Sequence, residues 1–92
     1  MKKALFIDRD GTIIWEPPVT EQVNSLEQLQ FMPGVIGALS HIANSDFELV
    51  IASNQDGLGT PANPLDRFNL IHNKMLETLR GEGVTFAAQL ID

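Results

Sequence analysis

Three short apolar runs alternate with two helical segments, and this alternation restricts the chain to few folds. The expected strands are residues 4–8, 47–52 and 86–91. Between them we expect a helix over 33–44 begun by Pro33, and a longer helix capped by Asn63, opened by Pro64 and ended by Gly81 and Gly83. Strands separated by helices pair in parallel, so we predict an α/β fold with a β-α-β-α-β parallel sheet.

Apolar residues at helical spacing define the faces that should meet this sheet. They are Ile36, Leu39 and either Ile42 or Ala43 in the first helix, and Leu65, Phe68, His72, Met75 and Leu79 in the second. We expect His72, on the apolar side of its helix, to be packed or hydrogen-bonded.

Composition excludes several classes of protein. The 92 residues, 43% of them hydrophobic, suit one small globular domain over 1–92. No apolar run approaches the ~18 residues of a membrane span, and a net charge of −6 disfavours nucleic acid and anionic membranes as partners. The chain has no cysteine, so neither disulfides nor a thiolate metal site can form. We therefore expect a cytoplasmic protein.

The stretch "FIDRDGTII" places two carboxylates directly after a buried strand. In an extended chain, residues two apart point to the same side, so Asp8 and Asp10 should face one way and Arg9 the other. Two carboxylates on one side repel each other unless a cation sits between them. The pair therefore indicates a metal site.

A second polar segment, "ASNQDG", follows the second strand. Ligands of parallel sheets bind beyond the carboxyl ends of the strands, so both segments should meet at one edge. The Ser53 hydroxyl and the backbone N–H groups after it suit a phosphate oxygen. Together with the carboxylates they indicate phosphoryl transfer through an aspartyl-phosphate. Alternatively, Asp-Gly and Ser-Asn are ordinary turn signals, and Gln55 and Asp56 either shape the loop or touch the substrate.

These residues resemble a known family. "DRDGT" after the first strand and "SN" after the second resemble the first two motifs of the haloacid dehalogenase superfamily phosphatases, which have a Rossmann-like three-layer core. "FIDRDGTIIWEPP", "FMPGVI", "SNQDGLGT" and "HNKML" resemble the histidinol-phosphatase domain, often the amino-terminal half of a bifunctional histidine-biosynthesis enzyme. The resemblance runs from Leu5 to Ile91. It implies hydrolysis of a small phosphate ester, L-histidinol phosphate, to L-histidinol.

The resemblance also implies the chemical roles in the first motif. Asp8 is the nucleophile that attacks phosphorus, and Asp10 is the acid and base for the alkoxide and the water. Asp8 and the backbone carbonyl of Asp10 are the Mg²⁺ ligands, which suits a hard ion that prefers oxygen. Gly11 permits the turn that brings Thr12 beside the phosphate.

The remaining roles implied by the resemblance concern the phosphate and the substrate. Ser53 and the backbone of Asn54 bind phosphoryl oxygens. Glu16 meets the cationic ammonium or imidazole of the substrate, and Gln55 is a further candidate for substrate contact.

Part of the family pattern is missing. Family members continue after the third strand with a cysteine-rich zinc loop, a motif lysine and acidic residues after a fourth strand, whereas this sequence ends at "LID". No lysine occupies the motif position, and the family's structural Zn²⁺ is not expected. We therefore expect a partial, truncated phosphatase domain with impaired activity. A non-catalytic remnant that binds metal or a partner chain is the alternative, and a receiver-like phosphoacceptor domain is a third hypothesis.

The topology predicts an assembly. If the strands lie in chain order, right-handed crossovers place both helices on one face of the sheet and leave the other face bare, with the first strand as an open edge. About six exposed apolar side chains would then forfeit on the order of 10 kcal/mol. We therefore expect a homodimer, or a partner chain, to cover the bare face.

Overall fold

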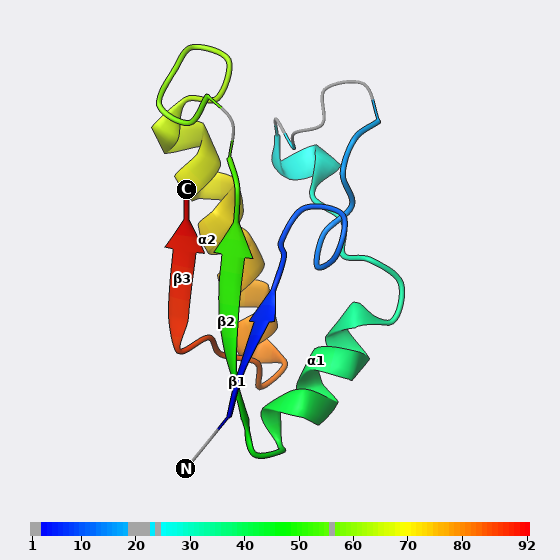
Figure 1. Cartoon of the computed structure of the whole chain (residues 1–92). Coiled ribbons are helices and arrows are strands. Elements are labelled where there is room, and N and C mark those ends of the chain that lie inside the picture. Colours follow the sequence, from blue (N-terminus) through cyan, green and yellow to red (C-terminus); the bar gives the residue numbers. More distant parts are fainter. Residues whose placement is uncertain (1–2, 19–22, 24, 56) are drawn as a thin grey trace.

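The computed structural model describes residues 3–18, 23, 25–55 and 57–92. Its elements are the strands β1 (Lys3–Ile7), β2 (Phe47–Ser53) and β3 (Ala88–Ile91), the helices α1 (Val35–Ala43) and α2 (Leu65–Gly81), and a short 3-10 helix η1 (Leu26–Gln28) (Figure 1). The expected order of strands and helices is confirmed.

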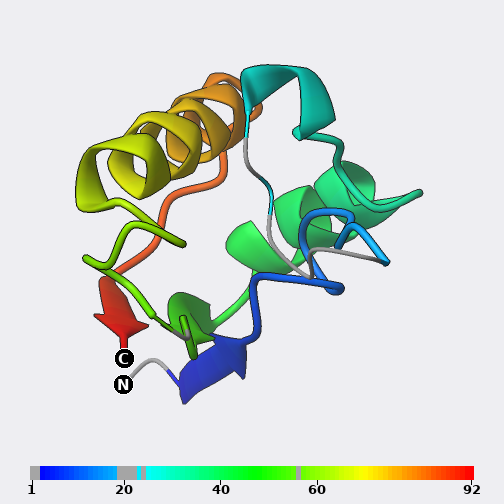
Figure 2. The ribbon, with the colours of Figure 1, turned by 90° about the horizontal axis from the view of Figure 1, so that it is seen from above.

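The three strands form one parallel sheet in the order β1-β2-β3. Phe6 lies beside Val50, and Val50 beside Ala88, so these three side chains share one face. Both helices lie on the other face, as seen along the strands in Figure 2. The predicted α/β fold, with strands in chain order and helices on one side, is therefore confirmed.

Both helices begin later than expected, for backbone reasons. Gly34, directly before α1, has a φ of 76°, which is a left-handed and not a helical conformation. The helix therefore begins after Gly34 and does not include Pro33. Before α2, Pro64 has a ψ of 139°, so the chain is still extended there and Pro64, not Asn63, is the N-cap residue. At its other end α2 stops at Gly81, and Gly83 has a φ of 79°, as expected for a glycine-ended helix.

The core lies between the sheet and the helices. Leu49 and Ile51 of β2 pack there with buried residues of both helices, namely Leu39, Met75 and Leu79. Ile13 and Ile14, from the segment after β1, are 0% exposed and belong to the same cluster. Leu65 was expected on the inner face but is 54% exposed, because α2 begins above the carboxyl ends of the strands (Figure 1).

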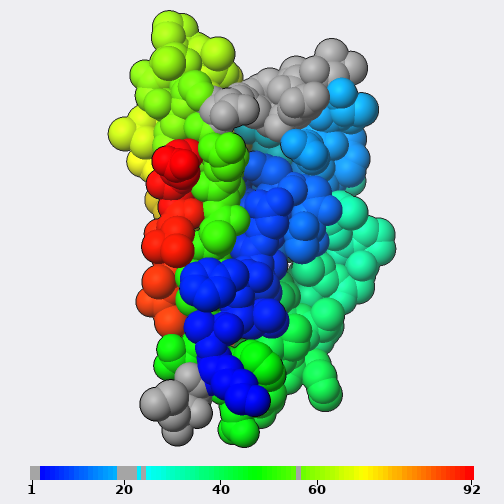
Figure 3. Space-filling view, viewed as in Figure 1, coloured from blue at the N-terminus to red at the C-terminus, as the bar shows by residue number. Residues whose placement is uncertain are grey.

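The opposite face of the sheet is uncovered among the described residues (Figure 3). Phe6 and Leu90 are 61% and 54% exposed there, whereas Val50 between them is only 7% exposed. The bare face is confirmed, but its large exposed apolar side chains number two (Phe6 and Leu90), not six, because Val50 is buried and the other apolar residues of this face are alanines. The forfeited free energy falls accordingly to roughly 2–4 kcal/mol.

Candidate active site

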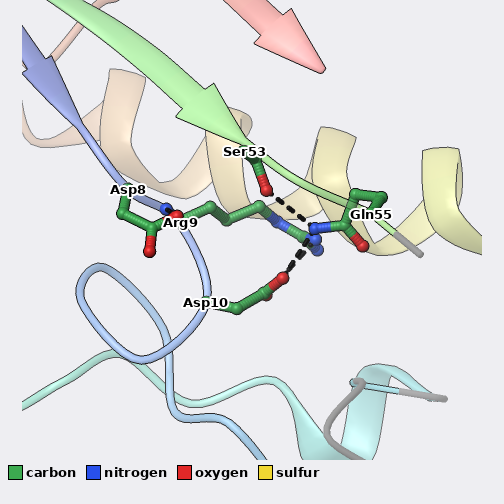
Figure 4. Close-up of polar contacts among 5 residues, drawn as sticks. All are labelled: Asp8, Arg9, Asp10, Ser53 and Gln55. Carbon is green, nitrogen blue, oxygen red and sulfur yellow. Dashed lines mark hydrogen bonds and ion pairs between the residues drawn. The ribbon is translucent and has the colours of Figure 1, made fainter. Parts of the chain in front are cut away.

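The ends of β1 and β2 bring the two polar segments together. Ile7 pairs with Ile51, so Asp8 follows β1 beside the end of β2, where Ser53 is the last residue. The Gln55 amide nitrogen donates to Asp10 Oδ2 at 2.6 Å and to Ser53 Oγ at 2.8 Å (Figure 4). The expected convergence is therefore observed, and one amide group connects the two segments.

The chain leaves β1 through a tight turn. The Arg9 carbonyl accepts hydrogen bonds from the backbone N–H groups of Ile13 at 2.9 Å and Ile14 at 3.1 Å. Gly11 has a φ of 82°, where side chains are strained, so the expected glycine turn is confirmed. Since Ile13 and Ile14 are fully buried, they anchor this turn, and the acidic segment before them, to the core.

The orientation of Arg9 differs from the prediction. Its Nη1 lies 3.3 Å from Asp10 Oδ1, so Arg9 and Asp10 face each other, while Asp8 stands apart (Figure 4). The prediction assumed an extended chain through Asp10, but β1 ends at Ile7 and the turn rotates the following side chains. The cation beside Asp10 is therefore the guanidinium of its own neighbour.

Arg9 is buried, with a side chain 4% exposed. Its guanidinium carbon lies 4.7 Å from the ring centroid of Phe68 on α2. Burial lowers the pKa of Arg9, and the nearby Asp10 carboxylate acts in the opposite direction. A cation–π contact and an ion pair thus compensate part of the cost of removing this charge from water.

Phe68 connects Arg9 to a second buried group. The rings of Phe68 and His72 are stacked, with centroids 5.2 Å apart. His72 Nε2 lies 2.7 Å from Gln89 Oε1 on β3, which confirms His72 as a packed, hydrogen-bonded residue. The pKa of His72 is lowered chiefly by burial; Gln89 opposes that shift, Arg9 adds to it, and Asp10 opposes it.

The other residues predicted for the site differ in solvent exposure. Ser53 and Gln55 are buried. The exposed residues are Asp8, Thr12, Glu16 and Asn54. Both amide hydrogens of Gln55 are used within the protein, which supports its loop-shaping role. Asp56 lies outside the described residues.

The donor set permits a magnesium ion with few protein ligands. Among the described residues, no three Asp, Glu, His or Cys side chains cluster closely enough to hold a metal. The Asp8 carboxylate is exposed, and its Oδ1 accepts a hydrogen bond of 2.9 Å from the Arg9 backbone N–H. Arg9 and Gln55 each contact one oxygen of the Asp10 side chain, and the second ligand that the resemblance implies is the Asp10 backbone carbonyl. Mg²⁺ commonly takes one or two carboxylates and fills its shell with water and phosphate, so these residues fit it.

Sequence reasoning missed the residues behind Asp10. Phe68 and His72 were expected only as core residues, and Gln89 was not considered. The i, i+4 spacing of two ring side chains on the inner face of α2 was the available signal, together with an arginine between two aspartates.

The comparisons with known proteins agree with the resemblance found in the sequence. No family model matches the chain. The histidine biosynthesis bifunctional protein HisB of Bacteroides fragilis is 55% identical over 92 residues, which are 99% of this chain and 25% of that protein. HisB of Spirosoma linguale is 53% identical and HisB of Campylobacter jejuni 47%, each with 24% of its length covered. The chain thus spans about a quarter of these curated relatives.

Solved structures share the fold. D,D-heptose 1,7-bisphosphate phosphatase from B. bronchiseptica, complexed with magnesium and phosphate, superposes with a TM-score of 0.85 and 28% identity. That match covers 98% of this chain and 49% of the phosphatase. A putative HAD-like phosphatase from Mesorhizobium loti gives a TM-score of 0.71 at 28% identity, with 92% of this chain and 39% of that one covered.

Proposed function

We propose that this chain, which is a homologue of part of the HisB proteins and has the fold of haloacid dehalogenase-like phosphatases, is a phosphomonoester hydrolase. The proposed enzyme depends on Mg²⁺ and is of the histidinol-phosphatase type. Its reaction would convert L-histidinol phosphate to L-histidinol. The observation that carries the proposal is the Gln55 amide, which joins the Asp10 carboxylate to the Ser53 hydroxyl at the strand ends, beside the exposed Asp8.

In the first step, an Asp8 carboxylate oxygen attacks phosphorus, and the bond from phosphorus to the ester oxygen breaks. The departing alkoxide takes a proton from the Asp10 side chain. In the second step, Asp10 takes a proton from water as the water oxygen attacks the aspartyl-phosphate. The bond between phosphorus and the Asp8 oxygen then breaks, which releases inorganic phosphate and restores the Asp8 carboxylate and the protonated Asp10 carboxyl group that began the cycle.

Polar groups at the strand ends would hold the phosphate. Phosphoryl oxygens commonly bind at the carboxyl ends of parallel strands. The groups available there are the hydroxyl of Ser53, which ends β2, the backbone N–H of Asn54 directly after it, and Thr12 in the turn after β1. Glu16 offers a carboxylate to the cationic end of the substrate. Since both amide hydrogens of Gln55 are engaged, its carbonyl oxygen is the atom that remains for a substrate donor.

Magnesium, held by the Asp8 carboxylate and the Asp10 backbone carbonyl, would neutralise charge on the phosphate. For these 92 residues assayed alone, our proposal includes impaired turnover, because they contain no counterpart of the motif lysine or the distal acidic residues. Loss of one preorganised electrostatic partner commonly lowers such rates ~10²–10³-fold.

We also propose a cytoplasmic location. No helix in the described part of the chain is long and apolar enough to cross a membrane.

The test is release of inorganic phosphate from L-histidinol phosphate, with and without Mg²⁺. We expect slow, Mg²⁺-dependent release that Asp8→Asn abolishes. Asp66→Asn is the matched control, since Asp66 is an exposed aspartate in the first turn of α2. Wild-type release no faster than in Asp8→Asn would favour the alternative, a non-catalytic module that binds metal or a partner chain.

A further inference from the structure

Arg9 and Gln55 hold the Asp10 carboxylate at both of its oxygens. Arg9 Nη1 lies 3.3 Å from Oδ1, and the Gln55 amide donates to Oδ2 at 2.6 Å. Arg9 approaches from the turn after β1 and Gln55 from the segment after β2. A carboxylate that is contacted at both oxygens from two directions has one favoured orientation. A single hydrogen bond would leave the group free to rotate.

Arg9 itself is held by aromatic packing. Its Nε is buried and has no hydrogen-bond partner among the described residues, so none of them fixes the inner end of the guanidinium by a polar contact. The Phe68 ring, 4.7 Å from the guanidinium carbon, supplies the contact instead. A planar guanidinium stacks on a ring in a way that a flexible ammonium cannot reproduce.

Phe68 is supported in turn by His72. The two rings are stacked at an interplanar angle of 16°, and the Gln89 Oε1 atom on β3 accepts a hydrogen bond from His72 Nε2. His72 is 4% exposed, and its Nδ1 is buried with no hydrogen-bond partner in the part of the chain that the structure describes. Because burial lowers the pKa of His72, the ring is neutral at pH 7 and does not add a second charge beside Arg9.

We propose that Arg9 is a positioning residue that fixes the Asp10 carboxylate, and that Phe68, stacked on His72, fixes Arg9. The orientation of Asp10 then depends not only on Gln55 but also on α2 and β3, elements that carry none of the residues assigned to the chemistry. The consequence for turnover rests on the proposed function, in which Asp10 is the acid and base. The positioning itself does not depend on it.

The Gln55 side-chain amide is the reporter, because its NMR resonances depend on the Asp10 oxygen that it contacts. Asp10→Ala defines where these resonances lie without that acceptor. We expect Arg9→Met and Phe68→Leu to move them toward the Asp10→Ala positions, and Arg9→Lys, which keeps the charge, to move them less. The controls make the same chemical changes elsewhere: Arg67→Met at an exposed arginine and Phe86→Leu at a half-buried ring, which should leave the resonances unchanged.

Wild-type Gln55 resonances in folded Arg9→Met would overturn the proposal. If Arg9→Met does not fold, Phe68→Leu decides: resonances at the wild-type position contradict the role of the ring, and displaced ones support it. A second measurement is steady-state turnover, in which Arg9→Met should lower kcat about 10²-fold while KM stays unchanged. An inactive wild type would refute the proposed function, while the resonances would still decide the positioning.

Discussion

Gln55 joins the two polar segments by hydrogen bonds, so its loss should separate them. Gln55→Met keeps most of the side-chain volume and removes both hydrogen bonds, one to the Asp10 carboxylate and one to the Ser53 hydroxyl. A bond to a charged group contributes ~1.5–3 kcal/mol and a neutral one ~0.5–1.5 kcal/mol. Because Gln55 is 7% exposed, water cannot replace the lost donor easily. We expect the free energy of unfolding to fall by about 2–4 kcal/mol.

Urea unfolding followed by fluorescence of Trp15, the one tryptophan of the chain, measures this loss. Ser53→Ala removes only the neutral bond and should lower the free energy of unfolding by ~0.5–1.5 kcal/mol. In an Asp10→Ala background, Gln55→Met should cost only that smaller amount, because the charged acceptor is already gone. A loss below about 0.5 kcal/mol for Gln55→Met in the otherwise wild-type chain would refute the reasoning.

Three further predictions concern metal, pH and assembly. Calorimetry should detect weak Mg²⁺ binding that Asp8→Asn abolishes; tight binding that survives this substitution would remove Asp8 from the ligands. Because the folded-state pKa of His72 is lowered, the unfolded chain takes up the proton first, so stability present above pH ~6.5 is lost as pH falls below it. Urea midpoints from pH 7.5 to 5 should fall less in His72→Gln than in wild type, with the exposed His41→Gln as control, and parallel curves would contradict this. Light scattering should show dimers or larger assemblies that Phe6→Ser with Leu90→Ser disperses, whereas a cooperatively melting wild-type monomer would show that the bare face needs no cover.

The sheet was predictable because its strands are short apolar runs bounded by polar residues. The parallel pairing follows from the alternation of strands and helices, whereas the chain order of the strands, on which the helix-free face depends, was an assumption that the structure bears out. The element ends were not predictable to the residue, since they depend on the backbone angles of Gly34 and Pro64. Ile13 and Ile14 were not expected in the core, because their spacing in the sequence does not predict the turn that brings them into the core cluster.

For the candidate site, too, the location was predictable from the sequence and the detailed geometry was not. Its location was predictable, because parallel neighbours bring Asp8, Asp10 and Ser53 to one edge. The side-chain directions were not, because the extended geometry ends at Ile7 and the turn points Arg9 toward Asp10. The partner of Arg9 on α2 could not be inferred from local spacing, since Phe68 is 59 positions further along the chain.

The proposed mechanism requires the Asp8 carboxylate to accept the phosphoryl group. Incubation with L-histidinol phosphate and Mg²⁺, followed by an acid quench, reductive trapping and mass spectrometry of the peptides, locates any covalent phosphate. We predict modification at Asp8, reduced to background in Asp8→Asn and retained in Asp66→Asn. Phosphate on another residue, or an unmodified Asp8 while phosphate is being released, would contradict the claim.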